Sequence, residues 1–339
     1  MGLLLPLYFC AFVALMVGSE GGLANGQYYR HVGNRRLPYQ TFFVDQSGRG
    51  NFSTIQSAID AVHPNNTFWI CIRIKAGTYR EKVKIPNDKP YIILKGQGRR
   101  NTWVEWDDHY DTAQSPTFTS EADNIVAKSI SFRNTYNNPA NKNPTAPAVA
   151  AMVKGDKSAF YRCGFYGVQD TLWDVQGRHY YHKCTIQGAI DFIFGAGQSL
   201  FEQCSIAYFG EGVEPGTVGY ITAQGRTGPY DSNGFVFKDC SVHGSGSTYL
   251  GRPWRDYSRV IFYNSNFSHV VHPRGWSPGA GSVGKEQQLT YAEHSCFGPG
   301  ANTSQRVSWV KKLGEAELNQ FTSMSYIDST EGWLNDQPF

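Results

Sequence analysis

The sequence has little net charge and few charged residues. Asp, Glu, Lys and Arg make up 17% of its 339 residues, and the formal net charge is +3. Domains that bind nucleic acid usually carry a much stronger basic balance. Composition therefore gives no support for a nucleic-acid partner, although it is compatible with a mildly acidic polymer.

Long hydrophobic runs are confined to the first residues. The chain is nearly uncharged from Met1 to about Leu23 and apolar from Leu3 to Val17, which suits the core of a signal peptide better than a membrane span. We expect a signal peptide over residues 1–24, with a membrane anchor as the alternative. Residues 25–339 should form a single domain without a membrane partner, because no linker, low-complexity region or later membrane-length run interrupts them.

The sequence also has no metal-binding pattern of the zinc or calcium type. His179 and His182 come nearest, but residues three apart on a strand point to opposite faces. We therefore expect no metal and no cofactor. The segment 275–279 matches the G-x-S-x-G pattern of serine hydrolases, yet Pro278 has no N–H for the oxyanion hole, so we treat the match as accidental.

Features of a secreted protein are present. Apart from Cys10 in the leader, the chain has six cysteines, an even number that permits disulfides without dictating their pairing. Glycosylation triplets of the N-x-S/T type occur at Asn51, Asn65, Asn266 and Asn302. We expect a secreted glycoprotein of the extracellular space or cell wall.

A repeated pattern indicates the architecture. An apolar residue, a small residue three positions later and an apolar residue two further on recur in Phe160-Cys163-Phe165, Tyr181-Cys184-Ile186, Phe201-Cys204-Ile206 and Phe237-Cys240-Val242, and more loosely in Ala127-Ile130-Phe132 and Phe262-Ser265-Phe267. Irregular periods near 20 residues, with short strands, favour a parallel β-helix with inserted loops. The alternative is a β-sandwich, whose strands should alternate and turn every 8–12 residues.

Stacked coils would bring Cys163, Cys184 and Cys204 together on consecutive turns. They could be buried thiols that fill the core, or neighbours could form a disulfide. The segment Asn51 to Val62 has the apolar spacing of a short helix, which could cap the N-terminal end of the stack. The stretch from Gly314 to Phe339 is expected to cover the other end.

The repeat places two acids in the same phase. Asp170 follows Cys163 by seven residues and Asp191 follows Cys184 by seven, so the two carboxylates should lie one coil apart. Carboxylates that close repel, which raises the pKa of one member and lets the pair titrate as a unit. The structural alternative is two unrelated surface acids.

Four motifs in order carry a resemblance to a known family. The segments GTYRE (77–81), GVQDTL (167–172), DFIFG (191–195) and LGRPW (250–254) resemble the signature set of plant pectin methylesterases. The opening 44–62 and the GW at 275–276 are similar to the same family. The resemblance implies an all-β, right-handed, single-stranded parallel β-helix of the pectin-lyase type. Within the family, the sequence is most similar to pollen-type pectinesterases, some of which are allergens. We expect no inhibitor-like pro-domain.

The resemblance also implies a carboxylic ester hydrolase with assigned roles. Asp191 would be the nucleophile on a methylated galacturonate, Asp170 the general acid and then base, Arg252 the partner of Asp191, and Gln169 an oxyanion donor. Aromatic faces for sugar rings would come from Trp254, Trp276, Trp173 and Phe194. The partner would be methyl-esterified pectin, with a proteinaceous pectinesterase inhibitor as a further partner, and the protein would be a monomer.

Two positions depart from the family pattern. Pro147 stands where the family has a glutamine before an AVA segment, and proline cannot donate a hydrogen bond. Because losing one oxyanion donor costs roughly 10²–10³ in rate, we expect activity that survives but is reduced. Ala196 follows DFIFG where asparagine is common, without a clear consequence.

Two rival functions stay open at the level of sequence. Two acids at about 5 Å also suit a retaining glycosidase, and β-helices that cut the pectin backbone exist as hydrolases and lyases. A pectin-binding wall protein without catalysis is the second rival, which Pro147 favours. Release of methanol, rather than new chain ends or binding alone, separates them.

Overall fold

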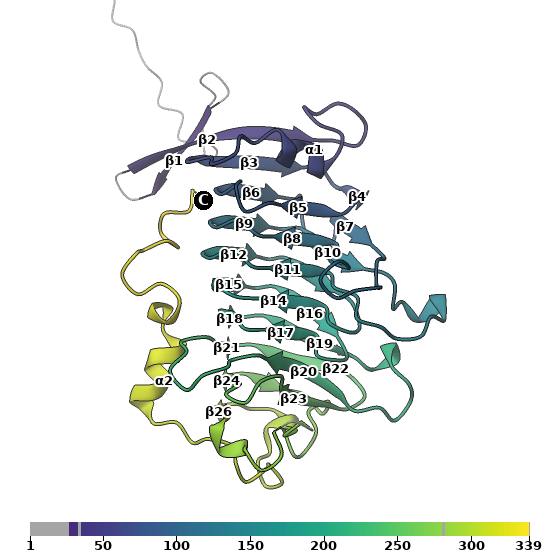
Figure 1. Cartoon of the computed structure of the whole chain (residues 1–339), viewed down its shortest axis with the longest axis vertical. Helices are drawn as coiled ribbons and strands as arrows, with labels where there is room; N and C mark the ends of the chain where they lie inside the picture. Colours follow the sequence, from purple (N-terminus) through teal and green to yellow (C-terminus); the bar gives the residue numbers. More distant parts are fainter. Residues whose placement is uncertain (1–26, 33–34, 280–281, 339) are drawn as a thin grey trace, which may run out of the picture.

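The chain folds into a stack of coils. The structure, a computed structural model, describes residues 27–32, 35–279 and 282–338, with side chains from Gln40 onward. The expected signal peptide lies outside these residues. Three sheets run the length of the stack, and the strands follow one another down the long axis of the molecule (Figure 1). The architecture is the right-handed parallel β-helix expected from the sequence.

The first sheet has eleven strands among the described residues. β1 pairs with β2 in antiparallel orientation, and every later pairing in this sheet is parallel. In spatial order the strands are β1 (Gln27–Val32), β2 (Arg35–Val44), β3 (Trp69–Ile74), β6 (Ile92–Lys95), β9 (Ile125–Lys128), β12 (Ser158–Tyr161), β15 (Arg178–His182), β18 (Gln198–Glu202), β21 (Gly234–Lys238), β24 (Arg259–Tyr263) and β26 (Thr290–His294).

The second and third sheets are parallel throughout their described strands. The second contains β4 (Gly77–Arg80), β7 (Thr102–Trp106), β10 (Ser131–Asn134), β13 (Gly164–Tyr166), β16 (Thr185–Gly188), β19 (Ser205–Phe209), β22 (Ser241–Ser245) and β25 (Asn266–Phe267). The third contains β5 (Val83–Ile85), β8 (Phe118–Ser120), β11 (Ala151–Val153), β14 (Leu172–Asp174), β17 (Ile193–Gly195), β20 (Gly219–Gln224) and β23 (Thr248–Pro253).

The sequence repeat corresponds to the coils. Phe160 pairs with Tyr181, Tyr181 with Phe201, and Phe201 with Phe237 on successive strands of the first sheet. Their rings are stacked inside the helix, with centroids 5.0, 4.5 and 4.5 Å apart. Each strand lies in register with the next, so identical phases in the sequence become neighbours in space. The β-sandwich alternative is therefore wrong.

The cysteines form a ladder of free thiols. All six cysteines of the described chain are unpaired, and five of them are buried. Cys184 donates from Sγ to the carbonyl of Phe160 on the preceding coil at 3.3 Å, and Cys204 and Cys240 make the equivalent contacts. The cysteines of the ladder are therefore buried thiols that fill the core. No disulfide joins neighbouring cysteines within the described residues.

A short helix covers the interior of the stack at the N-terminal end. α1 spans Ile55–Asp60, with Thr54 as its N-cap, and buries Ile55, Ala58 and Ile59 against the core. The carboxylate of Glu81 accepts hydrogen bonds from the backbone N–H groups of Ile55 and Gln56 at 2.9 and 3.0 Å. The helix is shorter than the predicted Asn51–Val62, because Phe52 is engaged in a bridge with Val44.

The C-terminal segment does not cover the other end of the stack, which corrects the prediction for Gly314–Phe339. It lies along the flank of the first sheet in Figure 1, where Leu318, Tyr326, Ile327 and Trp333 pack on outward side chains of that sheet. An amphipathic segment can cover any exposed apolar face, and the pattern alone does not say which. The segment contains α2 (Glu315–Thr322) and the 3₁₀ turn η5 (Met324–Tyr326).

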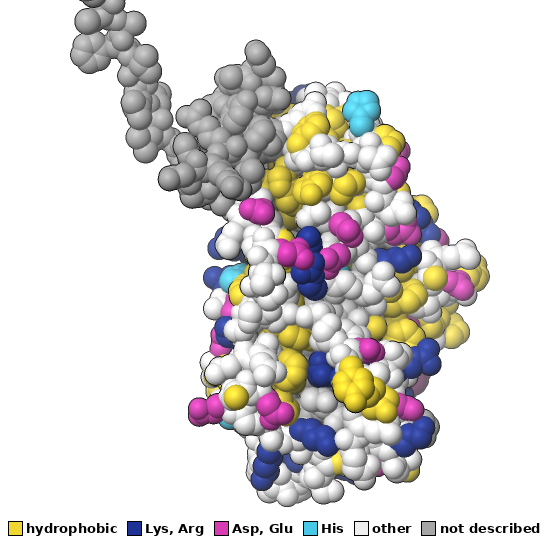
Figure 2. Space-filling model, turned by 60° about the vertical axis from the view of Figure 1, so that its left-hand side comes forward, with side chains coloured by type: hydrophobic (Ala, Val, Ile, Leu, Met, Phe, Trp, Pro, Cys, Tyr) yellow, Lys and Arg dark blue, Asp and Glu magenta, His cyan; other side chains and the backbone are white. Residues whose placement is uncertain are grey.

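The remaining helical elements are single 3₁₀ turns in the loops between coils: η1 (Pro139–Asn141), η2 (Gly210–Gly212), η3 (Glu286–Gln288) and η4 (Pro299–Ala301). Among the described residues, no helix has the length and apolar character needed to cross a bilayer. On the face shown in Figure 2, acidic and basic side chains are interspersed, in keeping with the small net charge.

Candidate active site

Asp170 and Asp191 lie at equivalent points of two consecutive coils. Gln169 bridges to Ile190, and the backbone N–H of Asp170 donates to the carbonyl of Ile190 at 3.0 Å. Both acids have left-handed backbone, with φ of 61° and 48°. The same left-handed backbone recurs in the turns of other coils, for example at Arg162, Lys183 and Gln203, so the two acids occupy regular turns of the stack. The adjacency predicted from the repeat is present.

Arg252 reaches Asp191 from two coils further on. Its Nε and Nη2 donate to the two carboxylate oxygens of Asp191 at 2.9 and 2.6 Å, a bidentate ion pair. The guanidinium also lies 4.1 Å above the ring of Tyr220, a residue that sequence reasoning missed. The side chain of Asp191 is 16% exposed and that of Arg252 36%, so the carboxylate is the better shielded of the two partners. Arg252 therefore fixes the orientation of the Asp191 carboxylate.

The environment of Asp170 favours the opposite charge state. Burial, and then the negative charge of Asp191, raise the pKa of Asp170 to about 7, against a smaller opposing effect of Arg252. The pKa of Arg252 is raised in turn, chiefly by its hydrogen bonds with Asp191. Below about pH 7 Asp170 is therefore mainly protonated, as a general acid must be, whereas the neighbouring Asp191 is ion-paired with Arg252.

Gln169 and Pro147 lie on adjoining coils. Gln169 is partly exposed beside the two acids, and within the described residues its side-chain amide makes no hydrogen bond. The amide is therefore free to donate to an oxyanion. Pro147 directly precedes Ala148, whose N–H donates to the carbonyl of Gln169 at 3.3 Å. Pro147 therefore offers no hydrogen-bond donor beside Gln169. Nothing in the structure gives Ala196 a role.

Three of the four expected aromatics gather beside the acids. The rings of Trp173 and Phe194 stack at 5.3 Å, and Phe194 meets Trp254 edge-on at 6.0 Å. Trp254 is 45% exposed, whereas Phe194 is 6% exposed. Trp254 therefore presents a face that a sugar ring can use, while Phe194 mainly supports its two neighbours.

Trp276 is not a sugar-binding residue, which corrects the prediction. Its side chain is fully buried, stacks on Tyr291 at 4.5 Å and donates from Nε1 to Glu293 at 2.9 Å. Its backbone bridges Gly251, next to Arg252. Motif matching identifies the residue type but cannot say which way a turn points it. Trp276 supports the strand that carries Arg252 from inside the helix.

The two histidines of the HYYH segment point apart, as predicted. His179 is buried and bonds Asp174 and the carbonyl of Gly155 at 2.8 and 2.9 Å. His182 is partly exposed and contacts the hydroxyl of Tyr180 at 2.7 Å. No group of three potential metal ligands occurs within the described residues.

Ser277, the serine of the G-x-S-x-G match, has no histidine partner within the described residues. Its hydroxyl accepts a hydrogen bond from the N–H of Gly279.

Comparisons with known proteins agree with this geometry. Residues 41–330 match the family model "Pectinesterase". The chain is 60% identical over 303 residues to "Probable pectinesterase 29" of Arabidopsis thaliana, covering 88% of this chain and 90% of that protein. It is similar to the solved pectin methylesterase from carrot, with a TM-score of 0.81 and 33% identity over 88% of this chain and 96% of the other. A pectin methylesterase in complex with a hexasaccharide has a TM-score of 0.73 and 25% identity, covering 88% and 98%.

Proposed function

The chain belongs to the pectinesterase family, and from that premise we propose how its residues hydrolyse the methyl esters of pectin. The overall reaction converts a methylated galacturonate of homogalacturonan and water into a free galacturonate, methanol and a proton. The protein is thus a carboxylic ester hydrolase. Four side chains share the two steps of this reaction: Asp191, Asp170, Arg252 and Gln169.

In the first step, a carboxylate oxygen of Asp191 attacks the ester carbonyl carbon. Arg252 orients this carboxylate, and the amide of Gln169 donates to the developing oxyanion. The bond from the carbonyl carbon to the methoxy oxygen then breaks. Asp170 transfers its proton to that oxygen, so methanol leaves and an acyl-enzyme anhydride on Asp191 remains.

In the second step, Asp170 acts as the base. Its carboxylate takes a proton from water while the water oxygen attacks the acyl carbon. The bond to Asp191 breaks, which restores the Asp191 carboxylate and the protonated Asp170 and leaves a galacturonic acid on the polymer, which releases its proton to solvent. The raised pKa of Asp170 allows it to serve as acid and base in turn.

One observation carries this assignment: Arg252 pairs with Asp191 alone of the two acids, although the acids lie one coil apart. Two chemically identical side chains are thereby made unequal. A glycosidase would also use two acids, but the family and the bidentate arginine on the nucleophile favour ester hydrolysis.

Methanol release from highly methylated pectin tests the assignment. We expect Asp191→Asn to lower the rate by at least about 10³-fold, and Asp170→Asn by about 10²–10⁴-fold, since general acid catalysis contributes that much. Asp174→Asn, close in sequence but buried away from solvent, reports unspecific structural damage. Methanol release by Asp191→Asn at the wild-type rate would contradict the mechanism.

We further propose a monomeric, secreted protein of the cell wall, with one domain over residues 25–339. Asn51, Asn65, Asn266 and Asn302 are all exposed, which supports their use as glycosylation sites. The hexasaccharide complex of a structural relative supports an extended substrate. A proteinaceous inhibitor is a further proposed partner. A mass decrease on enzymatic removal of N-glycans from the secreted protein tests the glycosylation.

A further inference from the structure

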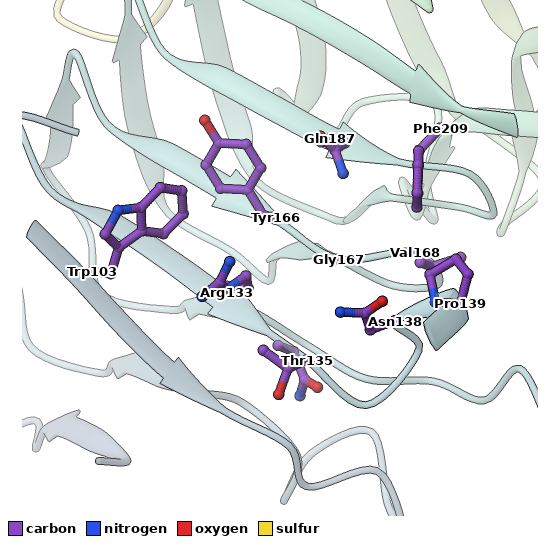
Figure 3. Close-up of a pocket in the computed structure, with 11 residues that line it drawn as sticks. Trp103, Arg133, Thr135, Asn138, Pro139, Tyr166, Gly167, Val168, Gln187 and Phe209 are labelled. Atoms are coloured by element: carbon purple, nitrogen blue, oxygen red, sulfur yellow. The ribbon is translucent and has the colours of Figure 1, made fainter. Parts of the chain in front are cut away.

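A pocket lies on the outer side of the second sheet, beside the turn that carries Asp170. It has a volume of about 260 Å³, and Trp103, Arg133, Tyr166, Gln187 and Phe209 are among its lining residues. Figure 3 shows the rings of Trp103 and Tyr166 at one end, with Pro139, Val168 and Phe209 at the other. None of the residues assigned above to the chemistry lines it.

The aromatic end of this pocket is built around an arginine. The rings of Trp103 and Tyr166 lie 5.1 Å apart, and the guanidinium of Arg133 lies 4.9 Å from the ring of Trp103. Gly164 permits this arrangement, because a Cβ there would lie 2.4 Å from the ring of Tyr166. Aromatic rings beside a cation and an amide, here from Gln187, suit a sugar that carries a carboxylate.

The charges around the pocket favour an anion. Burial raises the pKa of the Tyr166 hydroxyl, and the charge of Arg99, a hydrogen bond with Thr185 and the charges of Arg100 and Arg133 oppose that rise, so the hydroxyl lies in a positive field. Glu105 is the acid that pairs with Arg133. The Arg133 side chain is 41% exposed, and within the described residues Nη2 bonds Glu105 while Nη1 has no partner, so Nη1 can donate to a ligand.

The pocket is close enough to the acids to hold another part of the same polymer. Val168 lines it and precedes Asp170 by two residues, so their Cα atoms lie within about 7 Å. We propose that this pocket binds a de-esterified galacturonate of the pectin chain while the paired acids act on a methylated one. The proposal rests on the proposed function. It makes the protein prefer partly demethylated substrate.

Binding of defined oligogalacturonides tests the proposal, with Asp191→Asn as the background to prevent turnover. We expect Arg133→Gln to raise the Kd of an unesterified oligogalacturonide at least about tenfold, because a charge-assisted hydrogen bond is lost. The Kd of the fully methylated oligomer should change less than about twofold. Trp103→Ala should weaken binding of both oligomers, because stacking does not depend on charge.

The chain offers a matched control. Arg80 lies 4.9 Å from the ring of Trp106 and pairs with Asp107, in the same manner as Arg133, but does not line the pocket. Arg80→Gln should leave both Kd values unchanged. Equal weakening of both oligomers by Arg133→Gln, or no effect of either pocket variant, would overturn the proposal. Methanol release by Asp191→Asn would instead count against the proposed mechanism and leave the binding comparison intact.

Discussion

At the scale of residues, Pro147 is the position where a substitution is expected to raise the rate, because proline has no side-chain donor to offer an oxyanion. It precedes Ala148, whose N–H donates to the carbonyl of Gln169, so a glutamine at position 147 would stand next to Gln169 on the adjoining coil. We expect Pro147→Gln to raise kcat for methanol release by up to roughly 10²-fold, with little change in KM.

Gln169→Ala provides the comparison for this prediction. If the wild-type protein depends on Gln169 alone, Gln169→Ala should lower kcat by about 10²–10³-fold, and Pro147→Gln should recover part of the loss. An unchanged kcat in Pro147→Gln would show that another group already stabilises the oxyanion.

Asp170 should make the activity fall as the pH rises. Because the proposed acid must be protonated and its pKa is raised to about 7, kcat/KM should fall about tenfold per pH unit above that value. A profile of methanol release from pH 5 to 9 measures the fall. A rate that stays level to pH 9 would exclude Asp170 as the acid.

The same carboxyl makes stability depend on pH. Its pKa is raised from 3.8 to about 7 on folding, so between these values the folded state binds more protons than the unfolded state. Its contribution to stability is fully present below about 4 and is lost as the pH rises through about 7. Urea unfolding at pH 4 and pH 8 should show a smaller pH-dependent decrease for Asp170→Asn than for the wild type.

At the scale of elements, the coils are held together by ladders of similar side chains, aromatic in one ladder and small in another. Phe201 stacks on Tyr181 and Phe237, each at 4.5 Å, and is fully buried. Phe201→Ala should lower the free energy of unfolding by about 3–5 kcal/mol. Cys204→Ser should cost less than about 1.5 kcal/mol, because Ser265 occupies the same ladder position two coils later. Equilibrium urea unfolding measures both.

The free thiols are also testable as a group. Alkylation of the denatured protein without reductant should modify every cysteine of the ladder, and reductant should leave the melting temperature unchanged. In the native protein burial should protect Cys163, Cys184, Cys204 and Cys240. A reductant-dependent loss of stability would indicate a disulfide.

At the scale of the whole molecule, the C-terminal segment protects the apolar flank of the first sheet. Leu318 and Trp333 cover a row of side chains that includes Leu200 and Val236. A chain that ends at Lys312 should lose several kcal/mol, at about 1.5–3 kcal/mol for each large apolar side chain uncovered, and should aggregate. Thermal unfolding and light scattering measure this. Met324→Ala, at a 40% exposed side chain, should behave as the wild type.

The repeated phase of the sequence by itself determined the parallel β-helix and the meeting of Asp170 with Asp191. This succeeds because each coil pairs with the next in register, so equal positions in neighbouring repeats must be neighbours in space. The residue types of the paired acids, and the absence of a donor at Pro147, were likewise evident from the sequence.

Only the tertiary structure decided what depends on contacts between distant segments. Arg252 lies 61 residues after Asp191, and the family resemblance named it as the partner of Asp191, but only the structure shows the bidentate geometry of the pair and the ring of Tyr220 beneath the guanidinium. The inward direction of Trp276 and the flank covered by the C-terminal segment depend on packing in the same way. A repeat carries register from coil to coil, whereas the direction of a loop side chain is set by what surrounds it.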